Sequence, residues 1–61
     1  MRPEIEQELE YQKEKRDEML NGNEYRYIKG EIIELQRDAI ADRIRVEYAH
    51  IVDKILRNNN L

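Results

Sequence analysis

The sequence contains no cysteine, serine, threonine, phenylalanine or tryptophan. Without cysteine it cannot form a disulfide or a thiolate metal site. Without serine, threonine or cysteine it lacks the three commonest side-chain nucleophiles, which argues against acyl-transfer and hydrolase chemistry. A single histidine offers little for zinc. We therefore expect a non-enzymatic protein with no catalytic residue, no cofactor and no bound metal.

Long apolar segments are also missing. No run approaches the ~20 residues that a membrane span needs, and residues 1–4 lead directly into charged residues, which predicts that there is no signal peptide. We expect a cytoplasmic protein without a membrane partner. A chain of 61 residues forms at most one small domain. Domains of that size bury only about 60% of their chain surface and often need a partner for stability.

Charged residues are abundant instead, at 41% of the chain, but the net charge is only -3. Both signs are interleaved throughout, which is typical of a long solvated helix. Phosphate binding requires a one-sided positive stripe, and we therefore do not expect direct contact with nucleic acid. The basic residues of the second half point in nearly all directions around a helix: Arg37, Arg43, Arg45, Lys54 and Arg57.

A first helix is predicted over residues 3–20. Pro3 suits a first turn because its missing N–H would have no partner there, and the glutamates that follow favour the positive end of the helix. The apolar stripe of this helix is sparse. It consists of Ile5, Leu9, Met19 and Leu20.

Residues 21–23, Asn-Gly-Asn, are the clearest turn signal in the chain. Gly22 can adopt the left-handed conformation that ends a helix, and Asn23 can cap the next helix. A connection this short makes the two helices antiparallel neighbours.

A second helix is predicted over residues 24–57, with a frayed tail at 58–61. At about 100° per residue its apolar side chains form two stripes. The first stripe is expected to pack against helix 3–20 and contains Tyr25, Ile28, Ile32, Leu35 and Ala39. The second has no partner in the chain and is expected to form an oligomer interface through Ile33, Ile40, Ile44, Tyr48, Ile51 and Ile55.

The predicted lengths favour assembly, because helix 3–20 covers only the first half of helix 24–57. A row of aliphatic side chains left in water favours association. The expected fold is all-α: one domain over residues 1–61, a two-helix antiparallel hairpin with a long second helix, which assembles into a helical bundle or coiled-coil-like oligomer.

Glu47 and His50 have the Glu-x-x-His spacing found in di-iron carboxylate bundles, where both side chains face inward and share a metal. Arg43 and Lys54 lie about one turn on either side and would oppose a divalent cation. A polar face with a solvated histidine is therefore the favoured interpretation.

Residues 20–35, from Leu20 through Gly22, the Tyr25-Arg26 pair and Gly30 to the aliphatic-x-x-Leu ending at Leu35, resemble short bacteriophage-encoded helical hairpin proteins. The resemblance covers about a quarter of the chain. It implies a small accessory protein of a phage, located in the virion or in the host cytoplasm, and it implies no catalytic residue. Gly30 falls inside the predicted second helix, where a glycine costs about 1 kcal/mol, which predicts a close approach of another helix or of a partner at this position.

The leading hypothesis is a non-enzymatic interaction or structural protein, a homo-oligomer that docks on a larger protein assembly such as a phage particle. The alternative is a small phage-type inhibitor that binds and blocks a host enzyme. A third hypothesis is a ferroxidase-like helical bundle that binds metal.

Overall fold

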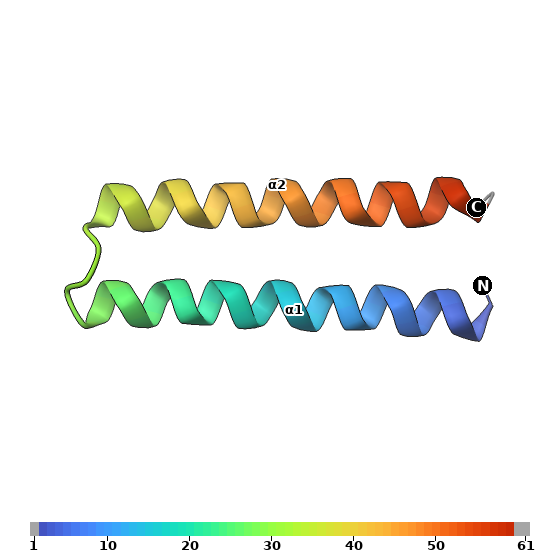
Figure 1. The fold of residues 1–61 in the computed structure, drawn as a ribbon, viewed down its shortest axis with the longest axis horizontal. Coiled ribbons are helices and arrows are strands. Elements are labelled where there is room, and N and C mark those ends of the chain that lie inside the picture. Colours follow the sequence, from blue (N-terminus) through green and yellow to red (C-terminus); the bar gives the residue numbers. More distant parts are fainter. Residues whose placement is uncertain (1, 60–61) are drawn as a thin grey trace.

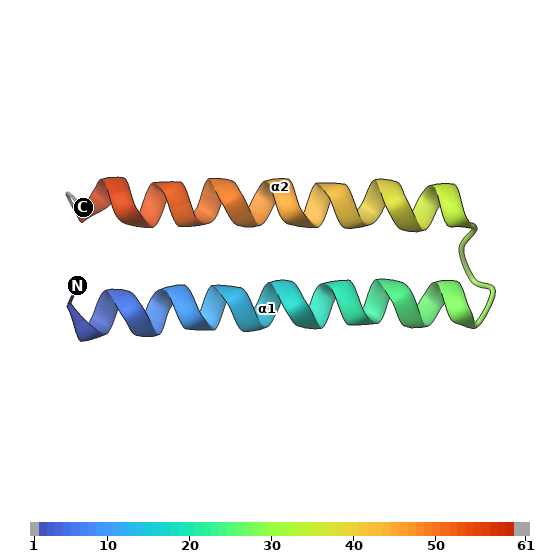
Figure 2. The same ribbon diagram turned by 180° about the vertical axis from the view of Figure 1, so that it is seen from behind.

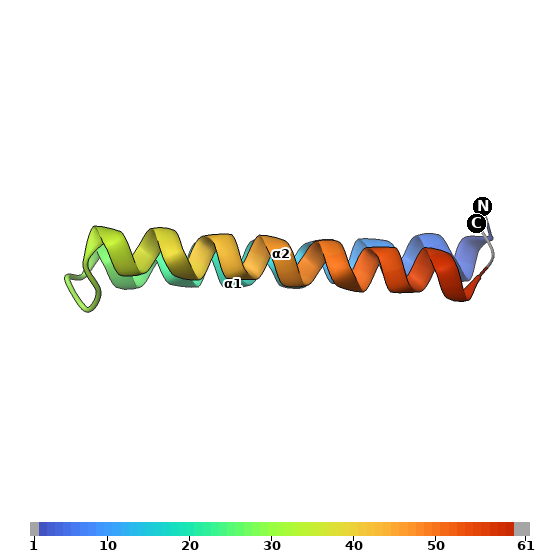
Figure 3. The same ribbon diagram turned by 90° about the horizontal axis from the view of Figure 1, so that it is seen from above.

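The chain folds into two helices of almost equal length in the computed structural model, which describes residues 2–59. Helix α1 (Pro3–Ile28) and helix α2 (Glu34–Asn58) lie antiparallel and side by side, and the start of α1 and the end of α2 share one end of the molecule (Figure 1). Figure 2 and Figure 3 show the same pair from behind and from above, as a single layer. The described residues contain no strand, which confirms the all-α class and the two-helix hairpin.

The molecule is a rod of 43 × 16 × 10 Å. Its radius of gyration is 14.1 Å, whereas a compact domain of this length has a value of about 10 Å. A rod of two helices has one narrow contact surface and no enclosed interior. Ile5, Ile32 and Ile44 are the buried apolar side chains, and no described side chain is completely buried.

The sequence explains the start of α1. Arg2 is extended (φ −68°, ψ 143°), as the residue before a proline prefers. Pro3 occupies the first turn, where no N–H is required. Glu4 and Glu6 follow in that turn and interact favourably with the positive end of the helix.

The end of α1 is a Schellman motif centred on Gly30. The Glu31 N–H donates to the Arg26 carbonyl at 2.9 Å, and the Gly30 N–H donates to the Tyr27 carbonyl at 3.0 Å. Gly30 has a φ of 79°, a left-handed conformation that costs other residues about 1–2 kcal/mol. The close approach predicted at Gly30 is wrong, because a Cβ atom there would meet nothing within 4 Å. Gly30 is instead the residue that terminates the first helix.

Helix α2 is capped at both ends by amide side chains. Gln36 Oε1 accepts a hydrogen bond from the Ile33 N–H at 3.0 Å, which is one half of a capping box, because isoleucine has no side-chain acceptor to supply the other half. At the far end Asn59 Nδ2 donates to the Ile55 carbonyl at 2.7 Å.

The predicted turn at residues 21–23 is wrong, and so are the helix boundaries 3–20 and 24–57 that depend on it. Gly22 lies inside α1 and does not have positive φ, and Asn23 is a buried contact residue rather than a helix cap. The local turn signal of Asn-Gly-Asn loses to tertiary contact. Asn23 and Tyr27 continue the face of α1 that packs against α2, so ending the helix at Leu20 would forfeit both contacts.

Moving the turn to residues 29–33 also removes the predicted length mismatch. Helix α1 extends along the whole of α2, and Val52, Ile55 and Leu56 near the end of α2 are half-buried rather than unpartnered. Of the predicted frayed tail, Asn58 is helical and Asn59 caps the helix, while residues 60–61 lie outside the described residues.

Replacing Gly22 with alanine should stabilise the hairpin. Gly22 is exposed in the middle of α1, and a Cβ atom there would meet nothing within 4 Å. Alanine is favoured over glycine in a helix interior by about 1 kcal/mol. Urea denaturation should show this gain, whereas the predicted turn at residues 21–23 requires a loss.

Candidate functional site

The contact surface between the helices, called the seam below, consists mostly of half-buried side chains and is partly polar. From α1 it contains Ile5, Leu9, Gln12, Arg16, Leu20, Asn23 and Tyr27. From α2 it contains Arg37, Ile40, Ala41, Ile44, Tyr48, Val52, Ile55, Leu56 and Asn59. Successive seam residues of α1 are three or four positions apart, as in a coiled coil.

The two predicted stripes of the second half have largely exchanged roles. Of the stripe assigned to the oligomer interface, Ile44 is buried and Ile40, Tyr48 and Ile55 are half-buried in the seam, while Ile33 and Ile51 are exposed. Of the side chains assigned to hairpin packing, Ile5 and Ile32 are buried and Leu9 and Leu20 half-buried. The others are exposed: Met19, Tyr25, Ile28, Leu35 and Ala39. The exchange follows from the misplaced turn, because moving the turn changes the face that α2 presents to α1.

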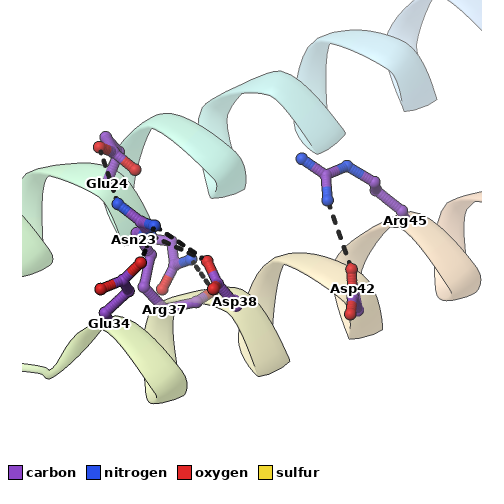
Figure 4. Close-up of polar contacts among 7 residues, drawn as sticks. All are labelled: Asn23, Glu24, Glu34, Arg37, Asp38, Asp42 and Arg45. Atoms are coloured by element: carbon purple, nitrogen blue, oxygen red, sulfur yellow. Dashed lines mark hydrogen bonds and ion pairs between the residues drawn. The ribbon is translucent and has the colours of Figure 1, made fainter.

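Arg37 is the centre of the main polar cluster, which joins both helices near the turn (Figure 4). Its guanidinium binds Asp38 through Nε and Nη2, both at 3.1 Å. It also lies 3.8 Å from Glu24 of α1 and 3.7 Å from Glu34. The hydrogen bond to Asp38 raises the pKa of Arg37 above its ordinary value, with a smaller contribution from Glu24. Arginine is charged at every relevant pH, so this group holds structure and cannot transfer protons.

Asn23 connects the same cluster to the backbone of α2. Its Nδ2 donates to the Arg37 carbonyl at 2.9 Å. A carbonyl can only accept, so the amide nitrogen must face it and the amide oxygen must face away. That oxygen is buried, and within the described residues it accepts no hydrogen bond. A buried acceptor without a partner costs about 1–3 kcal/mol.

Two arginine–tyrosine contacts, called the clasps below, join α1 and α2 across the seam. Each helix supplies the arginine of one clasp and the tyrosine of the other. The Arg37 guanidinium of α2 lies over the Tyr27 ring of α1, at 4.2 Å from its centroid. The Arg16 guanidinium of α1 lies over the Tyr48 ring of α2, at 4.5 Å. Each arginine side chain is less than one-third exposed, and contacts of this kind stabilise by about 0.5–2 kcal/mol.

Both clasps come from one repeated motif, Arg-Asp with a tyrosine eleven residues after the arginine, which sequence reasoning missed. The copies start at Arg16 and Arg37 and are 21 residues apart, or three heptads. In the first copy Asp17 binds the arginine Nε and Nη2 at 3.0 and 2.8 Å, as Asp38 does in the second. An internal comparison of the two halves at an offset of 21 residues would have found this signal.

An open groove of about 630 Å³ runs beside the Arg37 cluster. Leu20 and Ala41 line it together with Asn23, Glu24 and Asp38. Asp42 also lines it and binds Arg45 Nη1 at 3.5 Å, further along the same face (Figure 4). Three acids and two arginines are the charged residues of its lining, so the groove is polar and slightly acidic: Glu24, Asp38, Asp42, Arg37 and Arg45.

The turn end of the rod carries exposed apolar side chains, here called the tip: Tyr25, Ile28, Ile33 and Leu35. Their exposed fractions are 59%, 72%, 63% and 75%. Most large apolar side chains of soluble proteins are at least partly covered, so four exposed ones at one end of the rod are unusual. The sequence pattern predicts hairpin packing for three of the four, Tyr25, Ile28 and Leu35, and this prediction is wrong for them.

The Glu47–His50 spacing does not converge on a metal site. Glu47 Oε1 accepts a hydrogen bond from Arg43 Nε at 3.1 Å, and His50 is exposed. Among residues 2–59, no three histidine, cysteine or acidic side chains are grouped so that they could hold a metal ion.

Replacing His50 with glutamine should leave the free energy of unfolding within about 0.5 kcal/mol of the native value, because exposed substitutions rarely exceed that range. Urea denaturation measures this difference, and elemental analysis of the native protein accompanies it. Near-stoichiometric iron or zinc that disappears in the variant would restore the ferroxidase-like hypothesis.

The chain matches no protein-family model, no curated protein and no solved structure. Within the described part, neither helix is both long and apolar enough to cross a membrane.

Proposed function

We propose that this chain is a non-enzymatic interaction protein that docks on a larger protein assembly through its apolar tip. The exposure of Tyr25, Ile28, Ile33 and Leu35 at the turn end carries the proposal. The seam is supported by its own clasps and does not require these side chains. Leaving them in water therefore has a cost that a partner would remove.

The chemistry of the tip indicates the kind of partner. One tyrosine and three aliphatic side chains exposed at the same end of the rod suit an apolar surface of a protein that encloses this end, with the tyrosine hydroxyl at its wet edge. Full burial of all four side chains would contribute at most about 6–12 kcal/mol, similar to the cost of association. A single tip then binds weakly, and a surface that presents many copies of such a site would retain the protein by avidity.

A phage particle is such a surface, and the resemblance of residues 20–35 to phage helical hairpin proteins suggests this setting. The proposed role is a virion accessory protein. The runner-up, an inhibitor of a host enzyme, would use the same tip on a soluble partner.

Photo-crosslinking can distinguish these roles. A benzophenone amino acid at Leu35, in the tip, should crosslink to a protein of purified phage particles, whereas the same group at the exposed Lys13, in the middle part of α1 and away from the tip, should not. Ile28→Ser combined with Leu35→Ser should remove the protein from particles, while Val46→Ser, an exposed apolar position outside the tip, should not. Particles without this protein, or crosslinks only to a host enzyme, would contradict the virion role.

A further inference from the structure

Seam residues of α1 and α2 occupy the same heptad positions, as if the count of seven continued through the turn. Arg16 and Asn23 lie seven residues apart on α1, and Arg37 and Ile44 continue the same row on α2, with Gly30 between them. A second row contains Leu20, Tyr27, Ala41, Tyr48 and Ile55, again at multiples of seven. A hairpin does not require this coincidence, because its turn can start the second helix at any phase. One continuous helix over the same residues would carry a single unbroken stripe.

The clasps also share one centre. Arg16 and Tyr48 lie sixteen residues on either side of residue 32, and Tyr27 and Arg37 lie five residues on either side. A second, antiparallel copy with its twofold axis at residue 32 would therefore bring Tyr48 of that copy to Arg16 and Arg37 of that copy to Tyr27. In the dimer, each contact of the seam would be made twice: once between α1 of the first chain and α2 of the second, and once between α2 of the first and α1 of the second. The same residues would face each other as in the hairpin.

We propose that this chain exchanges helices with a second copy of itself. Residues 29–33 become helical, each chain opens into one long helix, and α1 of one copy pairs with α2 of the other. The dimer interface then includes Ile40, Ile44, Tyr48 and Ile55. Such an exchange is a low-cost route to dimers because both forms use the same contacts of the seam, and the change is confined to the turn, where the burial of Ile32 is lost.

The turn decides between the two forms. The closed hairpin needs the left-handed Gly30 and leaves Ile33 63% exposed. In the open form Ile33 lies seven residues before Ile40, on the seam side, and becomes covered. Glu34 then falls opposite Gly30 of the second copy, where no side chain competes with it. The exchange would cover Ile33 of the tip, but it is argued from the register of the seam and does not rest on the proposed docking function.

Gly30→Ala tests the exchange, because alanine disfavours the closed turn and favours the helix. The association constant of the dimer should rise by about a thousandfold or more, since two turns are affected per dimer. Sedimentation equilibrium should show the 7.5 kDa chain at about twice its mass. Gly22→Ala is the matched control, because residue 22 is helical in both forms and this variant should remain as monomeric as the native chain.

Intrachain distances distinguish an exchanged dimer from two closed hairpins side by side. Cysteines at Lys13 and Lys54 can carry spin labels without interference, since the sequence has no other cysteine. Labelled chains are diluted with unlabelled ones. In the open helix these positions are roughly 60 Å apart, whereas in the hairpin they lie on neighbouring helices, whose axes are about 8–10 Å apart.

The exchange predicts the long distance in the Gly30→Ala dimer and a minor long component in the native chain as its concentration rises. A monomeric variant, or a dimer with only the short distance, would overturn it. A variant without helical circular dichroism at any concentration would also overturn it, because the open form accepts alanine at residue 30.

Discussion

Replacing Ile44 with aspartate should unfold the hairpin. Ile44 is 8% exposed at the middle of the seam, and removing a buried isoleucine side chain costs about 2–5 kcal/mol. The desolvated carboxylate adds to that cost. A domain of this length has a total stability of about 3–9 kcal/mol, and a rod with three buried isoleucines lies at the low end. Far-UV circular dichroism should show the loss of most helical signal at room temperature.

Val46→Asp is the matched control, two residues further along the same helix. Val46 is 56% exposed, so its replacement should change stability by no more than about 0.5 kcal/mol. Equal effects of the two substitutions would contradict the seam. The reverse order would favour the original stripe assignment, in which the face of Leu35 and Ala39 packs against α1.

Asn23→Leu should stabilise the hairpin by about 1–2 kcal/mol. The substitution removes a buried oxygen that accepts no hydrogen bond among the described residues and adds apolar surface to the seam. It also removes the hydrogen bond from Nδ2 to the Arg37 carbonyl. The gain in stability should therefore be accompanied by weaker specification of the register, as for polar residues in coiled-coil seams.

Thermal denaturation at several protein concentrations measures both effects. The variant should melt at a higher temperature and should show more concentration-dependent association than the native chain. A loss of more than 1 kcal/mol would mean that Asn23 stabilises the seam, for example through an ordered water on its oxygen.

The sequence was sufficient to predict the helical class and the hairpin because these depend on composition and periodicity. The position of the turn depends on a competition between two glycines. Gly22 has the stronger local turn context, between two asparagines, while Gly30 follows a lysine. The pairing of the helices determines which glycine forms the turn. A turn at Gly30 allows Arg16 to reach Tyr48 and Tyr27 to reach Arg37.

The misplaced turn also explains the wrong assignment of packing and interface residues. The apolar residues of the second half do form stripes along the helix, but a turn at residues 21–23 gives each stripe the wrong partner. Asn23 was interpreted as a cap because asparagine after glycine is typical of a helix start, although its side chain lies in the seam. The polar members of the seam, Gln12 and Arg16, lie on a face where periodicity analysis counts only apolar residues.

The central claim is that α1 and α2 pair along their whole length in a register set by the two arginine–tyrosine clasps. Nuclear Overhauser effects from the tyrosine rings test it directly, because the chain has four tyrosines and no phenylalanine or tryptophan to overlap with them. The structure predicts contacts from the Tyr48 ring to the Arg16 side chain and from the Tyr27 ring to the Arg37 side chain. A Tyr48 ring without contacts to residues of α1 would contradict the account, since a turn at residues 21–23 leaves that ring beyond the reach of the first helix.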